Sequence, residues 1–306
     1  MIPTRSLAML ALAALTTTPA LGQDWKADYQ VVRFGVLSGE NEKDRVQRYD
    51  GLKSYLEKTL GVKVELFTAG NYDGVVQALA ANQIEFSFLG SSAYAAAWSE
   101  TKGGVIPLLA AEDADGTSGY YSTIVTRCAD DYKNVEDLKG KVLAFADPDS
   151  TSGYAVPFYN LVQQGFGDGF FSATPFSGSH EAGVQGVANG TFDAAATYEN
   201  SDTRGIPQRM VLKGMLKDGV ICKIWESPEI TNGPFTARAN LPEALIDDMR
   251  DALETFPTAD KAAFDAMVSN EIGGDNPVAG YTRVDHDHYQ WIIDMRDWLK
   301  EQRRRS

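Results

Sequence analysis

Three hydroxyl side chains stand in a row at Ser150, Thr151 and Ser152, after the apolar run 142–146 and the turn 147–149. The pattern predicts a strand that ends in a turn, followed by a helix whose first residues carry the hydroxyls. N–H groups in the first turn of a helix lack intrahelical acceptors and carry the positive end of the dipole, so an oxyanion can bind there. The run therefore predicts an oxyanion site. The alternative is that Ser150 or Ser152 only caps the helix.

Other polar side chains fall where predicted strands end. His180 lies at a strand-to-helix junction, where its imidazole either donates to a bound anion or bonds to nearby backbone. Ser91, in the small-residue turn 90–94, is a second candidate contact to an anion. Three tyrosines at or near predicted loops and helix starts are further candidates: Tyr49, Tyr94 and Tyr198. Their phenols either reach a ligand or pack at the edge of the core.

The elements that position these residues include a duplicated unit. Residues 76–86 recur in outline as residues 184–194, and each copy predicts a helix, an Asn-containing turn and a buried strand. A unit used twice in one chain predicts two similar α/β lobes, with a cleft between them. Because strands alternate with helices throughout, we expect a mostly parallel sheet in each lobe, and two crossover strands joining the lobes.

The length of 306 residues is typical of about two domains. Residues 1–22 are predicted to be a secretory signal peptide, because Arg5 precedes the apolar stretch 7–15 and small residues precede Gln23. That stretch is too short to span a bilayer. We expect the first lobe over residues 23–122, the second over 123–236, and C-terminal helices over 237–306 that return to the first lobe.

The net charge of the chain is −14, and loss of Arg5 with the leader makes it −15. A field of this sign repels nucleic acid and anionic membrane surfaces, so neither is predicted as a partner. It also repels a small anion at long range. An oxyanion site in this protein must therefore be built locally, from backbone amides and hydroxyls in close contact with the ligand.

The remaining reactive residues predict neither a metal site nor an enzyme. His286-Asp287-His288 is better explained as a solvated capping segment than as a metal site, and no cofactor is predicted. The sequence has no Gly-x-Ser-x-Gly elbow, Walker loop or dinucleotide fingerprint. Cys128 and Cys222 either form a disulfide or remain buried thiols, a choice that spacing alone does not decide.

Taken together, these motifs resemble the phosphonate-binding protein family: periplasmic binding proteins of phosphonate, phosphite and phosphate ABC importers, with the type II two-lobe fold. The resemblance extends over residues 31–238. It is strongest at the segment 147–153 followed by Val156-Pro157, and is supported by Gly178-Ser179-His180-Glu181, the stretch 187–193 and Ile224-Trp225-Glu226-Ser227-Pro228.

The resemblance implies that Ser150, Thr151, Ser152 and His180 hold phosphoryl oxygens in a trap that closes between the lobes. Family members that bind aminoalkyl phosphonates use acids for the ammonium group. Glu199 matches one of these with a shift of one residue, whereas Asn232-Gly233 replaces a second acid and Leu89 replaces an aromatic residue. The departures leave phosphite, phosphate or another phosphonate open as the ligand.

The resulting hypothesis is a periplasmic, non-enzymatic receptor that delivers a small oxyanion to an ABC permease and its ATPase. Two alternatives stay open at this point. One is an exported phosphoesterase, and the other is a soluble binding protein that passes its ligand to a signalling receptor.

Overall fold

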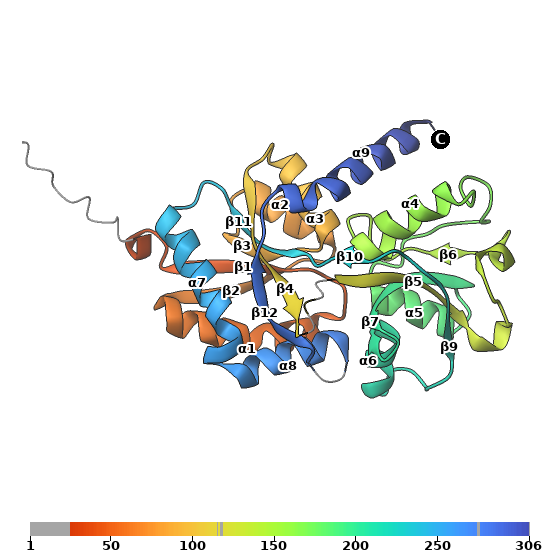
Figure 1. The fold of residues 1–306 in the computed structure, drawn as a ribbon, viewed down its shortest axis with the longest axis horizontal. Helices are drawn as coiled ribbons and strands as arrows, with labels where there is room; N and C mark the ends of the chain where they lie inside the picture. The colour runs from red at the N-terminus through yellow and green to blue at the C-terminus, as the bar shows by residue number, and fades with distance from the viewer. Residues whose placement is uncertain (1–24, 115, 117–118, 274–275, 306) are drawn as a thin grey trace, which may run out of the picture.

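The computed structural model describes residues 25–114, 116, 119–273 and 276–305. These form two α/β lobes that lie side by side, as Figure 1 shows. The predicted signal peptide, residues 1–22, lies outside the described residues. Among the described helices, none combines the length and apolar character needed to cross a membrane.

The first lobe is built on a sheet with the strand order β12-β4-β11-β3-β1-β2. Apolar side chains bury its central strands: Val32 and Phe34, which share one face of β1, belong to the same apolar cluster as Tyr49 and Leu52. The bounds of its strands are β1 (Val31–Val36), β2 (Lys63–Thr68), β3 (Phe86–Phe88), β4 (Val105–Asp113), β11 (Pro234–Arg238) and β12 (Val278–Arg283).

The second lobe is built on a sheet with the order β10-β5-β7-β6, in which β8 also pairs with β7 and β9 with β5. The chain enters this lobe from β4 to β5 and leaves it from β10 to β11. Its strands are β5 (Gly119–Arg127), β6 (Leu143–Ala144), β7 (Ala194–Ser201), β8 (Arg204–Gly205), β9 (Ile221–Glu226) and β10 (Ile230–Thr231).

The two-lobe α/β class is as expected, but the prediction of mostly parallel sheets is wrong in detail. Parallel pairing is found for β1 with β2 and β3, and for β6 with β7. The strands that pass between the lobes pair antiparallel with their neighbours, and so does β12. A strand that arrives from the other lobe, rather than through a local crossover helix, is free to take the antiparallel direction.

Helices cover the sheets of both lobes. The predicted apolar face of α1, which includes Tyr49 and Leu56, is buried, and Gly61 ends this helix with a φ of 71°. In the first lobe the helices are η1 (Trp25–Ala27), α1 (Glu42–Leu60), α2 (Tyr72–Ala80), α3 (Ser91–Glu100), α7 (Glu243–Ala259) and α8 (Lys261–Ile272). In the second they are η2 (Cys128–Asp130), η3 (Val135–Leu138), η4 (Thr151–Ala155), α4 (Val156–Gln163), α5 (His180–Ala188) and α6 (Ile206–Leu212).

The C-terminal helix α9 (Gln290–Arg305), which follows η5 (Asp287–Tyr289), contacts both lobes. It packs on α3 and also reaches the turn at η4. Arg296 donates to the hydroxyl of Ser92 in the first lobe at 2.8 Å and to the carboxylate of Asp149 in the second at 2.7 Å. The predicted division into residues 23–122, 123–236 and 237–306 stays a prediction.

The duplicated unit forms the same helix, turn and strand in each lobe, as α2–β3 and as α5–β7. The acids that end the two copies also act alike. Glu85 accepts a hydrogen bond from the N–H of Arg33 at 2.7 Å, and Asp193 accepts one from the N–H of Val142 at 2.8 Å. Asp193 therefore links the α5–β7 unit to the residue that precedes β6, which is a structural role.

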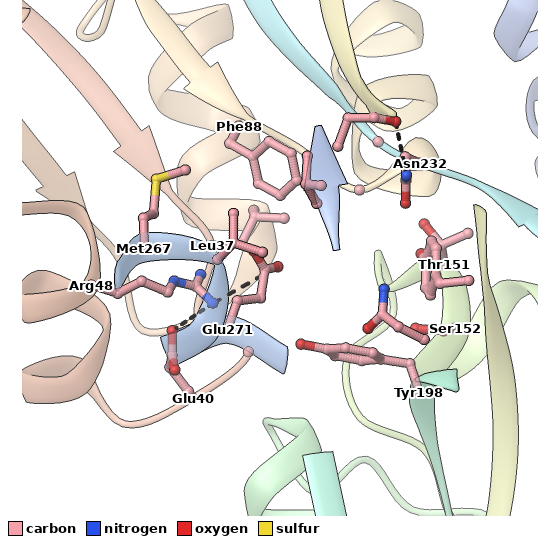
Figure 2. A pocket seen from close by; sticks show the side chains of 18 of the residues that line it. Leu37, Glu40, Arg48, Phe88, Thr151, Ser152, Tyr198, Asn232, Met267 and Glu271 are labelled. Carbon is pink, nitrogen blue, oxygen red and sulfur yellow. Dashed lines mark hydrogen bonds and ion pairs between the residues drawn. The ribbon is translucent and has the colours of Figure 1, made fainter. Parts of the chain in front are cut away.

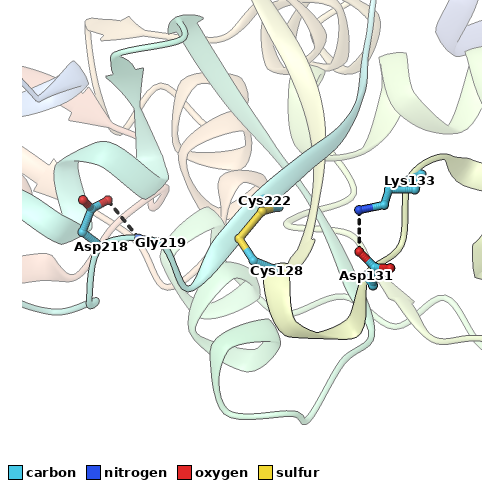
Figure 3. Close-up of a disulfide and its surroundings, with 6 residues drawn as sticks. All are labelled: Cys128, Asp131, Lys133, Asp218, Gly219 and Cys222. Carbon is cyan, nitrogen blue, oxygen red and sulfur yellow. Dashed lines mark hydrogen bonds and ion pairs between the residues drawn. A yellow bond between two sulfur atoms is a disulfide. The ribbon is translucent and has the colours of Figure 1, made fainter.

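Cys128 and Cys222 form a disulfide in the second lobe, shown in Figure 3. The Cα atoms are 4.9 Å apart, and the bond joins the end of β5 to β9. The pairing that the sequence left undecided is thus present, and it closes a loop with a sequence separation of 94.

Candidate functional site

The predicted oxyanion turn follows β6, at the start of the helical segment formed by η4 and α4. Ser150 is the N-cap of that helix, and its hydroxyl accepts a hydrogen bond from the N–H of Gly153 at 3.0 Å. The next residues form a single wide π turn, η4, closed by the N–H of Ala155 on the carbonyl of Ser150. The N–H groups of Thr151 and Ser152 find no acceptor among the described residues. Two unpaired amides thus border a cavity that both residues line.

The three hydroxyl residues of this turn have different roles. The capping interpretation holds for Ser150. Thr151 accepts a hydrogen bond on Oγ1 from the N–H of Ser92 in the other lobe, at 2.8 Å, so its own proton can be donated either to the phenol of Tyr120 or to a ligand. The carbonyl of Ser152 accepts a hydrogen bond from Ser122 Oγ at 2.7 Å, which fixes the turn on β5. All three residues are buried.

His180 is brought to this turn as the first residue of α5. Its Nε2 lies 3.3 Å from Ser150 Oγ, and its ring meets that of Tyr198 edge-on. This approach requires glycine at position 153, because a Cβ there would lie 2.9 Å from the His180 ring and 2.5 Å from Ala146 Cβ. Burial lowers the pKa of His180 to about 3, so the imidazole is neutral at physiological pH. It can serve an anion only as a neutral donor.

Tyrosines form much of the cavity lining. The candidates Tyr49 and Tyr198 line it, and so do Tyr72 and Tyr120, which sequence reasoning missed. Burial raises the pKa of Tyr120 to about 12, against the opposing effect of side-chain hydrogen bonds with Thr151 and Ser152. Burial likewise raises the pKa values of the other three phenols, so all four stay protonated and remain donors.

Three predicted site residues do not line the cavity. Tyr94 is buried in the first lobe, with its hydroxyl 3.1 Å from Nδ1 of His286. Ser91 donates to the carbonyl of Thr231 at 2.9 Å, although the preceding Gly90 does line the cavity. Glu199 is buried beside Lys223, at 3.0 Å, and its neighbour Asn200 is the lining residue. In an extended strand, consecutive side chains point to opposite faces, so a shift of one residue exchanges Glu199 for Asn200.

Figure 2 shows the cavity between the lobes, with Thr151, Ser152 and Tyr198 on one side and Phe88, Leu37 and Glu271 on the other. Its volume is about 160 Å³. Asn232, which stands where the family resemblance implied an acid, lines the cavity and donates its amide to the carbonyl of Ala111 at 3.0 Å.

A network of buried charges closes one side of the cavity. Arg209 of α6 lies 3.0 Å from Glu40 of the first lobe and 3.1 Å from Glu181 of its own lobe. Arg48 of α1 lies 3.1 Å from Glu40 and 3.8 Å from Glu271. Both guanidinium groups are therefore paired with carboxylates, and sequence reasoning missed this network because it joins segments that lie far apart in the sequence.

The segment after the second lobe contributes a wall of the cavity that no sequence signal indicated. Met267, Val268 and Glu271 come from α8, and Val278 and Tyr281 come from β12. Residues of α8 and β12 were expected only to pack on the first lobe. Their periodicity shows which face is apolar, but not that part of this face borders a cavity.

The candidate metal-binding groups have other roles within the described residues. His286 stacks on Trp98 with ring centroids 4.5 Å apart, in addition to its contact with Tyr94. The carboxylates of buried Glu199 and of exposed Asp202 and Glu226 gather in the second lobe, but all three are within ion-pair distance of the ammonium group of Lys223. A lysine thus takes the place that a cation would need.

Comparison with known proteins places the chain among transport proteins. The model of a family described as "ABC transporter, phosphonate, periplasmic substrate-binding protein" matches residues 34–289. The phosphate-import protein PhnD of Mycolicibacterium smegmatis is 31% identical over 231 residues, covering 72% of this chain and 70% of the relative. The phosphonates-binding periplasmic protein of Escherichia coli is 31% identical over 254 residues, covering 80% of this chain and 72% of the relative.

Solved structures confirm the two-lobe fold. A binding protein component of an ABC phosphonate transporter from Pseudomonas aeruginosa matches with a TM-score of 0.76 and 24% identity, over 87% of this chain and 85% of that one. PhnD1 from Prochlorococcus marinus, solved with methylphosphonate, matches with a TM-score of 0.73 and 21% identity, over 89% of this chain and 98% of that one. The fold expected from the sequence is the fold of these neighbours.

Proposed function

Because this chain belongs to the family of periplasmic substrate-binding proteins of phosphonate ABC transporters, we propose that it binds a phosphonate, phosphite or phosphate between its lobes. The observation that carries this proposal is the pair of unpaired amides at Thr151 and Ser152, which border the cavity together with the Thr151 hydroxyl. Such a cluster of donors matches the acceptor oxygens of a tetrahedral anion.

In this proposal neutral dipoles bind the anion. Within the described lining, His180 is neutral and the phenols of Tyr72, Tyr120 and Tyr198 are protonated donors. The lining guanidinium groups of Arg48 and Arg209 are paired with carboxylates. Donors held in a fixed arrangement and shielded from water need no reorganisation on binding, so they can offset the loss of the anion's hydration.

Closure of the lobes would couple binding to transport. The Thr151–Ser92 hydrogen bond and the Arg209–Glu40 ion pair both join one lobe to the other. A ligand that touches both lobes binds more tightly to the closed form, and thereby raises its population. We infer that an ABC permease with its ATPase recognises that form in the periplasm, after export through the predicted signal peptide.

The phosphoesterase alternative has little to support it. The relatives are named as import or binding proteins. The geometry also lacks a hydrolytic triad among the described residues, because His180 contacts Ser150 rather than Ser152, and Asp193 bonds to the N–H of Val142. Turnover of a chromogenic phosphate ester that Ser152→Ala abolishes would favour the enzyme over the receptor.

The test of the proposed function is a calorimetric titration of the purified protein with methylphosphonate, phosphite and phosphate. Saturable binding of at least one of the three, accompanied by a rise in melting temperature, is the expected result. No heat and no thermal shift with any of them would overturn the proposal. A permease and an ATPase encoded beside this protein would distinguish transport from delivery to a signalling receptor.

A further inference from the structure

The first-lobe side of the cavity forms an apolar chamber next to the anion turn. We use this name for the lining side chains of Leu37, Phe88, Phe235, Met267, Val268 and Val278. The wall is rigid, since the ring of Phe235 packs on those of Phe88, at 5.3 Å, and Tyr281, at 5.1 Å. Apolar walls in a preformed cavity favour an apolar group of the ligand over water.

The two halves of the cavity come from different lobes. The oxyanion turn, His180 and Tyr198 belong to the second lobe, whereas every member of the apolar chamber belongs to the first. Figure 2 shows Phe88 and Leu37 facing Thr151 and Ser152 across the cavity. A ligand that spans this space therefore presents its oxyanion to one lobe and another group to the other.

The size of the cavity exceeds what an inorganic anion needs. At about 160 Å³ it is comparable to a cavity of about 150 Å³ that can hold benzene, so a single tetrahedral anion would leave the chamber unfilled. Water left against apolar side chains lacks hydrogen-bond partners, and a substituent that displaces it gains affinity.

The charged groups beside the chamber argue against a second acidic group on the ligand. Arg48 lies 3.1 Å from Glu40 and 3.8 Å from Glu271, and Arg209 lies 3.0 Å from Glu40. Their positive charge is matched before any ligand arrives. Glu271 and Asp113 also line the cavity, and the three carboxylates of Glu40, Glu181 and Glu271 outnumber the two guanidinium groups, so a second anionic group on the ligand would be repelled here.

From these observations we propose that the chamber binds an uncharged, apolar substituent of an organophosphonate, alkyl or aryl, of about three to six carbon atoms. The inference rests on the proposed function and deepens it, because it assigns the ligand class within that site. The phosphonate group takes the amides of Thr151 and Ser152, and the carbon–phosphorus bond directs the substituent toward Phe88 and Val278.

The first test compares ligands with the unmodified protein by calorimetry: methyl-, propyl-, phenyl- and 2-aminoethylphosphonate, and phosphate. Each buried methylene should raise the affinity about fourfold, the equivalent of about 0.8 kcal/mol, so propylphosphonate should bind at least tenfold more tightly than methylphosphonate. Phosphate and 2-aminoethylphosphonate should bind more weakly than propylphosphonate. Tightest binding of either one would overturn the proposal.

The second test fills the chamber with Val278→Phe. The affinity of this variant for propyl- and phenylphosphonate should fall at least tenfold more than its affinity for methylphosphonate. Val46→Phe is the matched control, because Val46 is exposed on α1 and does not line the cavity. Equal losses for all phosphonates would contradict the chamber's role.

The outcomes distinguish failure of the chamber inference from failure of the proposed function. If methylphosphonate and phosphate bind but longer substituents do not, the chamber inference fails while the proposed function stands. If none of the phosphorus anions binds, the proposed function has failed. Should Val278→Phe not fold, as judged by circular dichroism, the ligand series with the unmodified protein still decides the question.

Discussion

Arg209 and Glu40 form an ion pair between the two lobes, with N and O atoms 3.0 Å apart and both side chains about 2% exposed. The same guanidinium contacts Glu181, and Arg48 contacts the other carboxylate oxygen of Glu40. These charges are buried only while the lobes are together. The network therefore makes the closed arrangement depend on complete charge pairing.

Removing Arg209 should act on ligand affinity more than on folding. Arg209→Met leaves Glu40 and Glu181 without their common partner, a loss that costs about 3–5 kcal/mol when the remaining charge stays buried. Separation of the lobes would return both carboxylates to water. We therefore expect at least tenfold weaker binding in calorimetry and a larger radius of gyration in small-angle scattering.

The control for that variant is Lys213→Met. Lys213 also pairs with a first-lobe acid, Asp44 at 2.7 Å, but both side chains are about one quarter exposed. Pairs of this kind contribute about 0–1 kcal/mol. Equal effects of the two substitutions on ligand affinity and radius of gyration would show that burial of the Arg209 network does not stabilise the closed arrangement.

Thr151→Ala should weaken phosphonate binding by about 1–3 kcal/mol, because a buried donor to a charged oxygen is lost. The substitution also removes the acceptor of the Ser92 N–H, which contributes to closure. Thr151→Ser should restore most of the affinity. Calorimetric dissociation constants for the three proteins check this, with Thr191→Ala as an exposed control.

His180 should make stability fall with acid. Its pKa is lowered by burial from 6.5 to about 3, so the unfolded chain binds a proton that the folded chain cannot. Stability is therefore complete above the unfolded pKa, and is lost as the pH falls from about 6.5 towards 3. At pH 5 the loss is about 2 kcal/mol.

Urea unfolding of the wild type and of His180→Gln at pH 7 and pH 5 measures this effect. The variant should lose less stability over that interval than the wild type does. His288→Gln, an exposed histidine of the same chain, should behave like the wild type. Identical pH dependence in all three proteins would contradict a buried, neutral His180.

Several parts of this site could be predicted from the sequence because they are local. The turn at Ser150–Ser152 follows from consecutive residues, and the duplicated unit follows from two similar windows. Other parts depend on contacts between distant segments. Arg48 and Arg209 lie on separate helices and meet only through Glu40, so no window of sequence contains the network.

The predicted site residues that do not line the cavity show a second limit of sequence reasoning. Glu199 and Asn200 are neighbours, and the face that each presents depends on the register of β7, which pairs with β5 and β6. Tyr94 occupies the fourth position of α3, and the packing of η5 and α9 on that helix buries it away from the cavity. The residue types in these segments do not by themselves determine the register of β7 or the packing on α3.

The disulfide between Cys128 and Cys222 should contribute to stability without tuning the site. It closes a loop with a sequence separation of 94, for which the chain-entropy model gives about 4–5 kcal/mol. Neither cysteine lines the cavity. The double variant Cys128→Ala, Cys222→Ala should therefore melt roughly 10 °C lower and bind its ligand with nearly unchanged affinity. A large loss of affinity in the folded variant would contradict this separation.

The central claim is that the amides of Thr151 and Ser152 hold the anion. The most direct test is a crystal structure of the protein with methylphosphonate, or with whichever phosphorus anion binds most tightly. We predict phosphoryl oxygens within about 2.7–3.2 Å of both amide nitrogens. An anion bound elsewhere, with those two amides contacting only water or protein carbonyls, would contradict the account.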